Sequence, residues 1–320
     1  MSQPDSINAS TSTSTSTTSV DASLGSDARF DDALRRVSFE PGMMLGVAAT
    51  RAEQDYHRRR ATRHAYWQHG SGTVVGLRVD KQGDDPGDDT TTARTRLLVT
   101  PGVGVDGLGR EVSVYEPYSI DLGAWLTTQH ADVDAWGALI ENGYDTASNA
   151  LWLQVTMRYQ DAPSGLQPRL ATEINAGTDP VGPSRVADGV LYELVAARPA
   201  DASQRAHPFA AHAGLPAFAD LAAGLAPDEQ ARLAAASGAA RAQLELGARL
   251  LHALGDDNQA LATRETFSRG AAELARTLLA WVAIRLTDGR DLVVNPRRVT
   301  VDNLARPFLF NASALAQLLR

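Results

Sequence analysis

The stretch Leu97–Val114, LLVTPGVGVDGLGREVSV, alternates short runs of β-favouring residues with turn residues. The runs Leu97–Thr100, Val103–Val105 and Glu111–Val114 each have the length and composition of a short strand. Between the second and third, Asp106-Gly107 is a dipeptide that tolerates the positive φ of a tight hairpin turn. This stretch therefore predicts a module built from short antiparallel strands.

The residues before this stretch predict one helix with a strand on either side. Thr50-Arg51-Ala52-Glu53 matches a capping box, in which the Thr hydroxyl and the Glu carboxylate each accept a bond from a free backbone N–H. It predicts a helix from Arg51 to about Gln68, ended by Gly70. Arg36–Gly46 predicts a short strand and a turn, and the alternating segment Thr73–Val79 predicts another strand.

Further along, two segments alternate apolar and polar residues. Leu151–Tyr159 and Gly189–Ala196 both predict strands. The connection between them contains four prolines and is expected to be a long, turn-rich loop. Residues 30–199 are thus expected to form a β-rich module that carries one capped helix.

Beyond residue 199 the composition shifts towards Ala, Leu, Arg and Glu. Pro227–Leu254 predicts helix, with Pro227 and the two acids after it in the first turn. Ser268–Leu286 predicts a second helix, Asp291–Val301 one or two short strands, and Leu304–Leu319 an apolar closing segment with a small helix. The expected fold class is α+β: an N-terminal arm (1–29), the β-rich module (30–199) and a mainly helical C-terminal part (200–320).

Composition excludes several kinds of chemistry. The 320 residues contain no cysteine, which removes disulfides, cysteine-based metal sites and a thiol nucleophile. Lys81 is the single lysine, so lysine chemistry has one poor candidate. His64 and His69 are five residues apart, which does not place them on one helical face, and we expect neither a metal nor a cofactor. The formal net charge of −8 opposes binding to nucleic acid.

No targeting or membrane segment is evident. The N-terminus lacks a basic region followed by an apolar one, so we expect synthesis in the cytoplasm without a signal peptide. The longest apolar run, Leu278–Ile284, is much shorter than the roughly 20 residues that a membrane span needs. We therefore expect no membrane insertion.

Two features suggest protein contacts. Ser10–Ser19 is an unbroken run of Ser and Thr, which predicts either a flexible tail or an arm that orders against a partner. The predicted helix carries a dense basic cluster, which is either a solvated face or a surface complementary to an acidic neighbouring subunit. The candidate interface residues are Ser10, Ser19, Arg58, Arg59, Arg60 and Arg63.

Catalytic and sugar-binding sites have weaker support. Gly102, Gly104 and Gly107 fit a G-x-G-x-x-G pattern, but no helix follows them, so a dinucleotide site is rejected. Asp106 and Glu111 are imaginable as paired carboxylates of a hydrolase, although a turn and a strand edge explain them without chemistry. A sugar-binding surface would need exposed aromatic side chains on a loop, and the candidates are Trp125, Trp136 and Tyr144.

Several segments together resemble a known group of proteins. They are Phe39–Leu45, Glu53–His64, His69–Val79, Val99–Val112 and Leu151–Tyr159, followed by Pro183–Val186 and Tyr192–Leu194. This order resembles bacterial proteins with a G-x-G-V-V-x-G-L-x-V…P-G-x-x-x-D-x-x-G-R-E-I signature, encoded with phage-tail-like contractile injection systems and prophage baseplates. The resemblance covers about half the chain. Many relatives carry cysteines in the loop before the Pro-Ser-Arg element, and this chain has none there.

The resemblance implies a structural component rather than an enzyme. We expect a structural or adaptor subunit of a contractile injection particle, in the baseplate or at a tail-fibre attachment, present in several copies and bound to other subunits of the tail. A receptor- or glycan-binding tail-fibre module is the alternative, and a carboxylate-dependent hydrolase is a weaker one. We expect no nucleic-acid partner.

Overall fold

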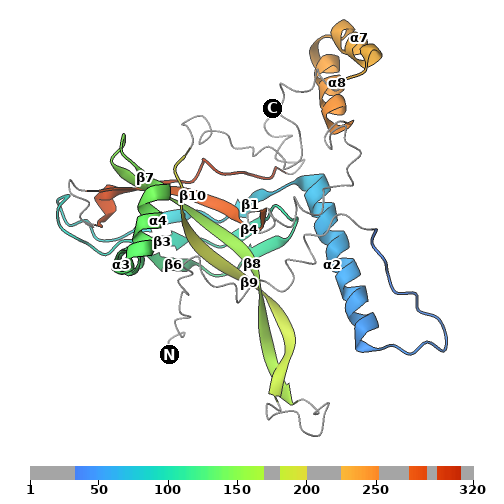
Figure 1. Cartoon of the computed structure of the whole chain (residues 1–320), viewed down its shortest axis with the longest axis horizontal. Helices are drawn as coiled ribbons and strands as arrows, with labels where there is room; N and C mark the ends of the chain where they lie inside the picture. The colour runs from blue at the N-terminus through green and yellow to red at the C-terminus, as the bar shows by residue number, and fades with distance from the viewer. Residues whose placement is uncertain (1–32, 169–180, 200–224, 252–273, 287–293, 311–320) are drawn as a thin grey trace.

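The computed structural model describes residues 33–168, 181–199, 225–251, 274–286 and 294–310 (Figure 1). In these ranges the helices are α2 (Val47–His69), α3 (Leu122–Ala131), α4 (Val133–Gly143), α7 (Pro227–Ala235), α8 (Gly238–Leu251) and the 3₁₀ turn η2 (Pro296–Arg298). The strands are β1 (Gly72–Gly76), β2 (Val79–Gln82), β3 (Arg96–Val99), β4 (Gly102–Val105), β5 (Glu111–Val114), β6 (Tyr118–Asp121), β7 (Tyr144–Asp145), β8 (Ala150–Pro168), β9 (Val181–Ala196), β10 (Thr277–Arg285) and β11 (Val299–Asp302).

Six short strands form two three-stranded antiparallel sheets. One sheet has the order β1-β4-β5 and the other has the order β2-β3-β6. Consecutive strands β1 and β2, β3 and β4, and β5 and β6 are divided between the two sheets, so the chain crosses from one to the other three times. At the first crossing Leu77 adopts φ 56° and its N–H donates to Pro101 O at 3.2 Å. The three strands predicted in Leu97–Val114 are confirmed as β3, β4 and β5.

The third sheet has the order β11-β10-β8-β7, with β9 also paired to β8. Its buried side chains join those of the two small sheets and of α3 and α4 in one apolar cluster. Leu77, Leu97, Leu151, Met157 and Ile284 are among the members with no exposed surface. All three sheets therefore share one core.

The expected helix-dominated C-terminal part is wrong. Residues 277–285, predicted as part of a helix over Ser268–Leu286, form the strand β10 between β8 and β11. All of its residues except Leu278 and Arg285 are buried, so the segment has no polar face. An apolar run buried on both faces has no periodicity that separates strand from helix, and the neighbouring strands decide its conformation. Helix is confirmed within Pro227–Leu254, as α7 and α8.

The β-rich module also contains more helix than predicted. The sequence analysis expected one helix before residue 199, but α3 and α4 form a second helical pair. Their N-caps are Asp121 and Asp132, whose carboxylates accept backbone N–H groups of the first turn. The predicted strand in Arg36–Gly46 is wrong as well, because this segment is extended without strand pairing and contains a turn at Pro41 and Gly42.

The start of α2 differs from the predicted capping box. The helix begins one turn earlier, with Gly46 as N-cap and no side-chain cap. Glu53 instead accepts a bond from the backbone N–H of Val37 at 3.0 Å and lies 3.0 Å from His57 Nε2. Glu53 thereby ties the preceding extended segment to the side of the helix. Gly70 ends α2 as predicted, with φ 79°.

The predicted proline-rich loop is mostly strand. β8 and β9 pair in one continuous register from Leu153–Ala196 to Pro168–Val181, and Pro163, Pro168 and Pro183 lie inside the strands. Pro180 lies outside the described residues. The hairpin leaves the core and projects from it (Figure 1). The predicted small helix within Leu304–Leu319 falls partly outside the described residues, and positions 304–310 contain none.

Candidate assembly surface

A buried ion pair organises the turn between β4 and β5. Asp106 and Arg110 have almost no exposed surface, and Arg110 Nε donates to Asp106 Oδ2 at 2.7 Å. The other carboxylate oxygen accepts the backbone N–H groups of Leu108 and Arg110, both at 2.9 Å. Burial raises the pKa of Asp106 to about 6, against the opposing effect of Arg110. These contacts assign a structural role to the D-x-x-G-R segment.

The same turn holds the C-terminal half of α2. Gly109 has φ 82° and lies directly against the backbone carbonyl of Thr62, so that a side chain at this position has no room. Thr62 and Tyr66 are buried at this contact, and burial raises the pKa of Tyr66. The N-terminal half of α2 extends beyond the turn and projects from the core (Figure 1).

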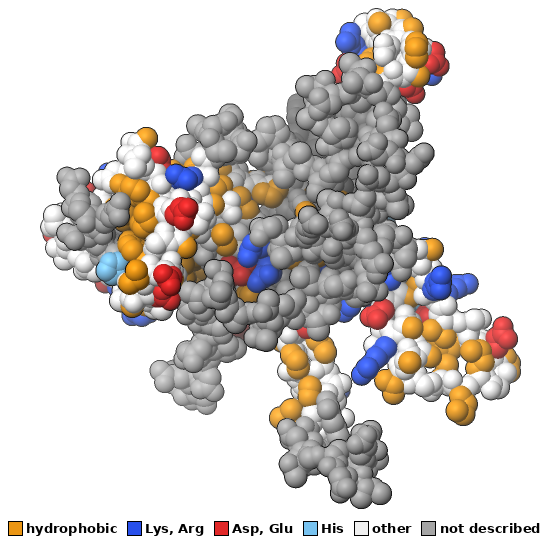
Figure 2. Space-filling view, viewed as in Figure 1, with side chains coloured by type: hydrophobic (Ala, Val, Ile, Leu, Met, Phe, Trp, Pro, Cys, Tyr) orange, Lys and Arg blue, Asp and Glu red, His pale blue; other side chains and the backbone are white. Residues whose placement is uncertain are grey.

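The projecting end of α2 carries an exposed apolar cluster, which we call the α2 tip. Its side chains are all more than half exposed, and Met44 is 96% exposed. Its members are Phe39, Met43, Met44, Leu45 and Val47. Figure 2 shows hydrophobic side chains gathered at the lower right, over the projecting end of the helix. Contiguous exposed apolar side chains of this kind mark interaction sites more often than scattered ones do.

The α2 tip is held by specific contacts. Met43 N–H donates to Glu40 O at 3.2 Å across the turn, and Val37 is bonded to Glu53. Thr50 donates through both its backbone N–H and its hydroxyl to Gly46 O. The tip is thus presented in a defined conformation. The sequence pattern of this segment predicts a strand and a turn, and the run Met43-Met44-Leu45 is the signal in it that points to an apolar surface.

The predicted interface arginines of α2 differ in how far they are exposed. Arg60 is exposed and donates to Tyr56 Oη at 3.0 Å, and Arg58 lies 3.6 Å from Asp55. Arg58, Arg59 and Arg63 are all half-buried. The four side chains therefore do not form one exposed basic face. Ser10 and Ser19 lie outside the described residues.

The projecting part of β8 and β9 forms a second exposed element, which we call the hairpin arm (Ala162–Pro168 and Pro183–Asp188). Every residue in these two ranges is exposed, including Leu166 and Val186. At the root of the arm, Asp161 and Asp188 are directly opposite each other, and Tyr159 Oη lies 2.9 Å and 2.7 Å from their carboxylates. These hydrogen bonds raise the pKa of Tyr159, in addition to the larger effect of burial. Arg110 lies over the Tyr159 ring and links the root to the β4–β5 turn.

The structure does not bring the hydrolase candidates together. Asp106 is buried and bonded to Arg110, whereas Glu111 is exposed on β5 and accepts a bond from the Ser113 hydroxyl. The raised pKa of Asp106 meets one requirement of a general acid, but the side chain has no exposed surface. The arrangement offers no cleft in which the two carboxylates face one substrate.

The aromatic candidates for sugar binding pack against the core. Trp125 lies on α3, Trp136 on α4 and Tyr144 on β7, and all three are partly buried against the apolar cluster. They are therefore not the exposed loop residues that a sugar-binding surface requires. The rings of His64 and His69 contact each other at 5.4 Å, and in the described ranges no group of three or more His, Asp or Glu could hold a metal ion.

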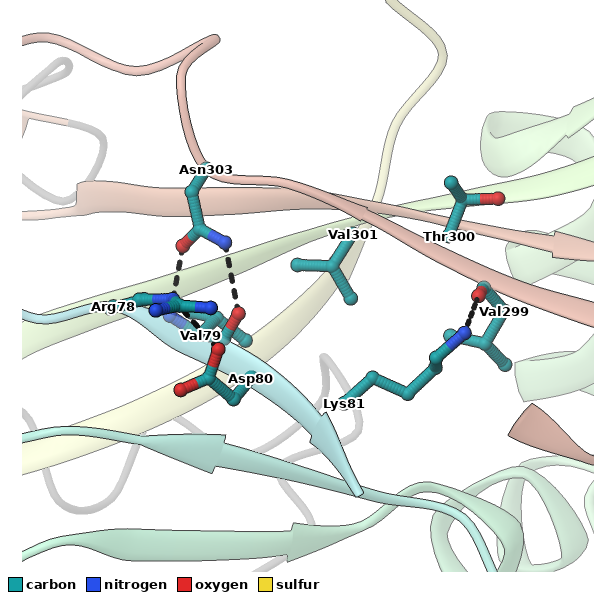
Figure 3. Close-up of a pocket in the computed structure, with 8 residues that line it drawn as sticks. All are labelled: Arg78, Val79, Asp80, Lys81, Val299, Thr300, Val301 and Asn303. Carbon is teal, nitrogen blue, oxygen red and sulfur yellow. Dashed lines mark hydrogen bonds and ion pairs between the residues drawn. The ribbon is translucent and has the colours of Figure 1, made fainter. Parts of the chain in front are cut away.

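A shallow groove of about 370 Å³ lies between the edges of β2 and β11 (Figure 3). Asn303 spans one end, accepting from Val79 N–H at 2.8 Å and donating to Val79 O at 2.9 Å. At the other end the Lys81 ammonium donates to Pro296 O and Val299 O. The single lysine of the chain thus joins the edge strand β2 to β11. The groove is the seam between these two strands, and the side chains of Lys81 and Asn303 bridge it.

No protein-family model matches the chain, and no curated protein matches it in sequence. Among the described helices, none is both long and apolar enough to cross a membrane. The features of the molecule that bear on its function are therefore the two exposed projections, the α2 tip and the hairpin arm, on a shared core.

Proposed function

We propose that this protein is a structural or adaptor subunit of a phage-tail-like contractile injection particle, in the baseplate or at a tail-fibre attachment. The observation that carries the proposal is the α2 tip, an apolar cluster held in a defined conformation at the end of a projecting helix. Apolar side chains in this position are stabilised only when another protein surface covers them. The sequence resemblance to proteins encoded with such particles supplies the type of assembly.

The hairpin arm supports the same role. A two-stranded hairpin without a covering layer is at best marginally stable in water, so an arm of this kind gains from contact with a neighbour. Its prolines remove backbone donors from exposed strand edges, which reduces unspecific strand pairing. Recognition through side chains such as Leu166 and Val186 is then favoured over open-ended sheet extension.

The proposal is tested in cells that produce the particles. Particles are purified from a strain with the wild-type chain and from strains with Met44→Asp or Leu166→Asp, and the chain is quantified by mass spectrometry. We expect the wild-type chain to sediment with the sheath and tube proteins, and each substitution to lower its amount at least tenfold. Thr300→Asp, an exposed change on β11 away from both projections, is the matched control.

Both substituted positions are exposed, so we expect the thermal unfolding midpoints of the purified variants to match that of the wild type. A wild-type chain that never sediments with contractile particles would contradict the proposed function. Sedimentation that is unchanged by both substitutions would show that neither projection is the attachment surface.

A further inference from the structure

The projecting half of α2 has an exposed face that the described residues of the chain leave uncovered. Val47, Ala48, Arg51, Ala52 and Asp55 are all exposed, and their spacing places them on one side of the helix. Further along, this side packs on the β4–β5 turn, where Thr62 meets Gly109. The same side of α2 is therefore buried near Thr62 and exposed from Val47 to Asp55.

The charged residues on this face can pair with the same residues of a second α2 helix. Among the described residues Arg51 has no ion-pair partner, and the nearest cation to Asp55 is Arg58, at 3.6 Å. If a second α2 lies antiparallel, with a two-fold axis near residue 53, Arg51 of each copy is opposite Asp55 of the other. A parallel arrangement would instead place Arg51 beside Arg51 and Asp55 beside Asp55. The charge pattern therefore favours an antiparallel pair.

The side chains between these charges permit close approach. Ala48 and Ala52 are small, and helices that pack through small residues approach within the usual 8–10 Å between axes. The available length, from Val47 to Arg60, is about 20 Å, because beyond it this side of the helix is buried at Thr62 and Tyr66. In the pair, Val47 of one copy lies opposite position 59 of the other helix. The second helix therefore covers Val47 and part of the apolar residues next to it in the α2 tip.

We propose that the projecting half of α2 binds a second copy of this chain as an antiparallel, two-fold symmetric helix pair fixed by Arg51–Asp55 contacts. The inference rests on the proposed function in that it names the partner of one assembly surface. The face and tip supply an area on the order of several hundred Å² per copy, at the lower end for specific interfaces. We therefore expect a reversible dimer that dissociates at low concentration.

The test is analytical ultracentrifugation of the purified full-length chain over a range of concentrations. We expect a monomer–dimer equilibrium for the wild type. Arg51→Asp and Asp55→Arg each replace both symmetric contacts with like-charge pairs, and we expect each to weaken the dimer about tenfold or more. The double variant Arg51→Asp/Asp55→Arg restores opposite charges across the axis and should recover most of the affinity. Asp84→Arg, on the exposed β2–β3 loop, changes the net charge by the same amount as Asp55→Arg and is the control.

Each outcome has one meaning. A chain that is monomeric at every concentration, or a dimer that is unchanged by both single substitutions, overturns the inference. Loss of affinity in both single variants without recovery in the double variant also overturns the antiparallel Arg51–Asp55 arrangement. A monomeric chain that still sediments with the particles would leave the proposed function standing. A dimer with the expected rescue that never sediments with particles would contradict only the proposed function.

Discussion

Gly109 and Thr62 are in direct backbone contact. The α-carbon of Gly109, in the turn between β4 and β5, lies so close to the Thr62 carbonyl that a β-carbon would overlap it. Gly109 also has φ 82°, which residues with a side chain rarely adopt. This one contact joins the projecting helix to the β-sheet core.

Gly109→Ala is therefore expected to lower the free energy of unfolding by more than about 2 kcal/mol, because it adds backbone strain to the steric overlap. Urea denaturation followed by circular dichroism measures the change. Gly137→Ala is the matched control, since Gly137 lies inside α4 with nothing near its Cβ position. That substitution should raise stability by about 0.5–1 kcal/mol. Equal effects of the two substitutions would contradict the packing role of Gly109.

Asp106 gives the chain a predictable dependence on pH. Its pKa is raised to about 6 in the folded protein, whereas an unfolded aspartate titrates near 4. The folded state therefore binds the proton more tightly, and the contribution of this group to stability is present below about pH 4 and lost as the pH rises through 6. Asp106→Asn should remove this dependence.

The measurement is urea denaturation of the wild type and Asp106→Asn from pH 4 to pH 7.5. We expect the stability of the wild type relative to the variant to fall with increasing pH, by up to about 3 kcal/mol. Asp84→Asn, at an exposed position, should leave the wild-type profile unchanged. A difference between wild type and Asp106→Asn that does not vary with pH would show that burial does not raise the pKa of Asp106.

Asn303 closes the seam between β2 and β11. Its amide bonds both backbone groups of Val79, as a paired strand residue would. Asn303→Ala leaves these two groups without their partner, and we expect a loss of about 1–3 kcal/mol. Hydrogen exchange at the Val79 amide should accelerate. Thr300→Ala, on the same groove and exposed, should change neither quantity.

Tyr159 holds two opposed carboxylates at the root of the hairpin arm. The single hydroxyl proton of Tyr159 is donated to either Asp161 or Asp188 at any moment. Tyr159→Phe removes this proton and leaves the two negative carboxylates facing each other. We expect faster amide exchange along Ala162–Pro168, a global stability loss of about 1 kcal/mol and partial recovery in high salt. Tyr115→Phe, at an exposed tyrosine, is the control. Protection of the arm that stays the same in Tyr159→Phe would rule out this role.

Several parts of the fold and the surface were accessible from the sequence. The strands β3, β4 and β5 were predicted because turn residues separate short β-favouring runs. The start of α7 at Pro227 was predicted from its proline and acidic first turn, and Glu229 does accept the backbone N–H of Ala226. In each case neighbours in the sequence supply the deciding interactions.

The candidate surface was only partly accessible. The sequence indicated α2 as an interface from its arginines, but it did not show that Arg60 is the exposed one of the four. It also did not show that Met43 and Met44 remain exposed, because two adjacent apolar residues in a sequence are equally typical of a buried core. Exposure depends on where the helix leaves the core, which the Gly109–Thr62 contact sets.

By itself, the sequence determined the chemistry that this protein lacks and the local elements whose signals are short-range. The absence of cysteine and the single lysine are properties of composition, and the turn between β4 and β5 is a property of the short segment Asp106–Arg110, although its positive φ lies at Gly109 and not, as predicted, at Asp106-Gly107. Only the tertiary structure decided that residues 277–285 form a strand, because β8 and β11 on its two sides provide the hydrogen bonds that an apolar run cannot specify alone. It also decided which apolar side chains stay outside the core, since burial depends on contacts between residues distant in the chain.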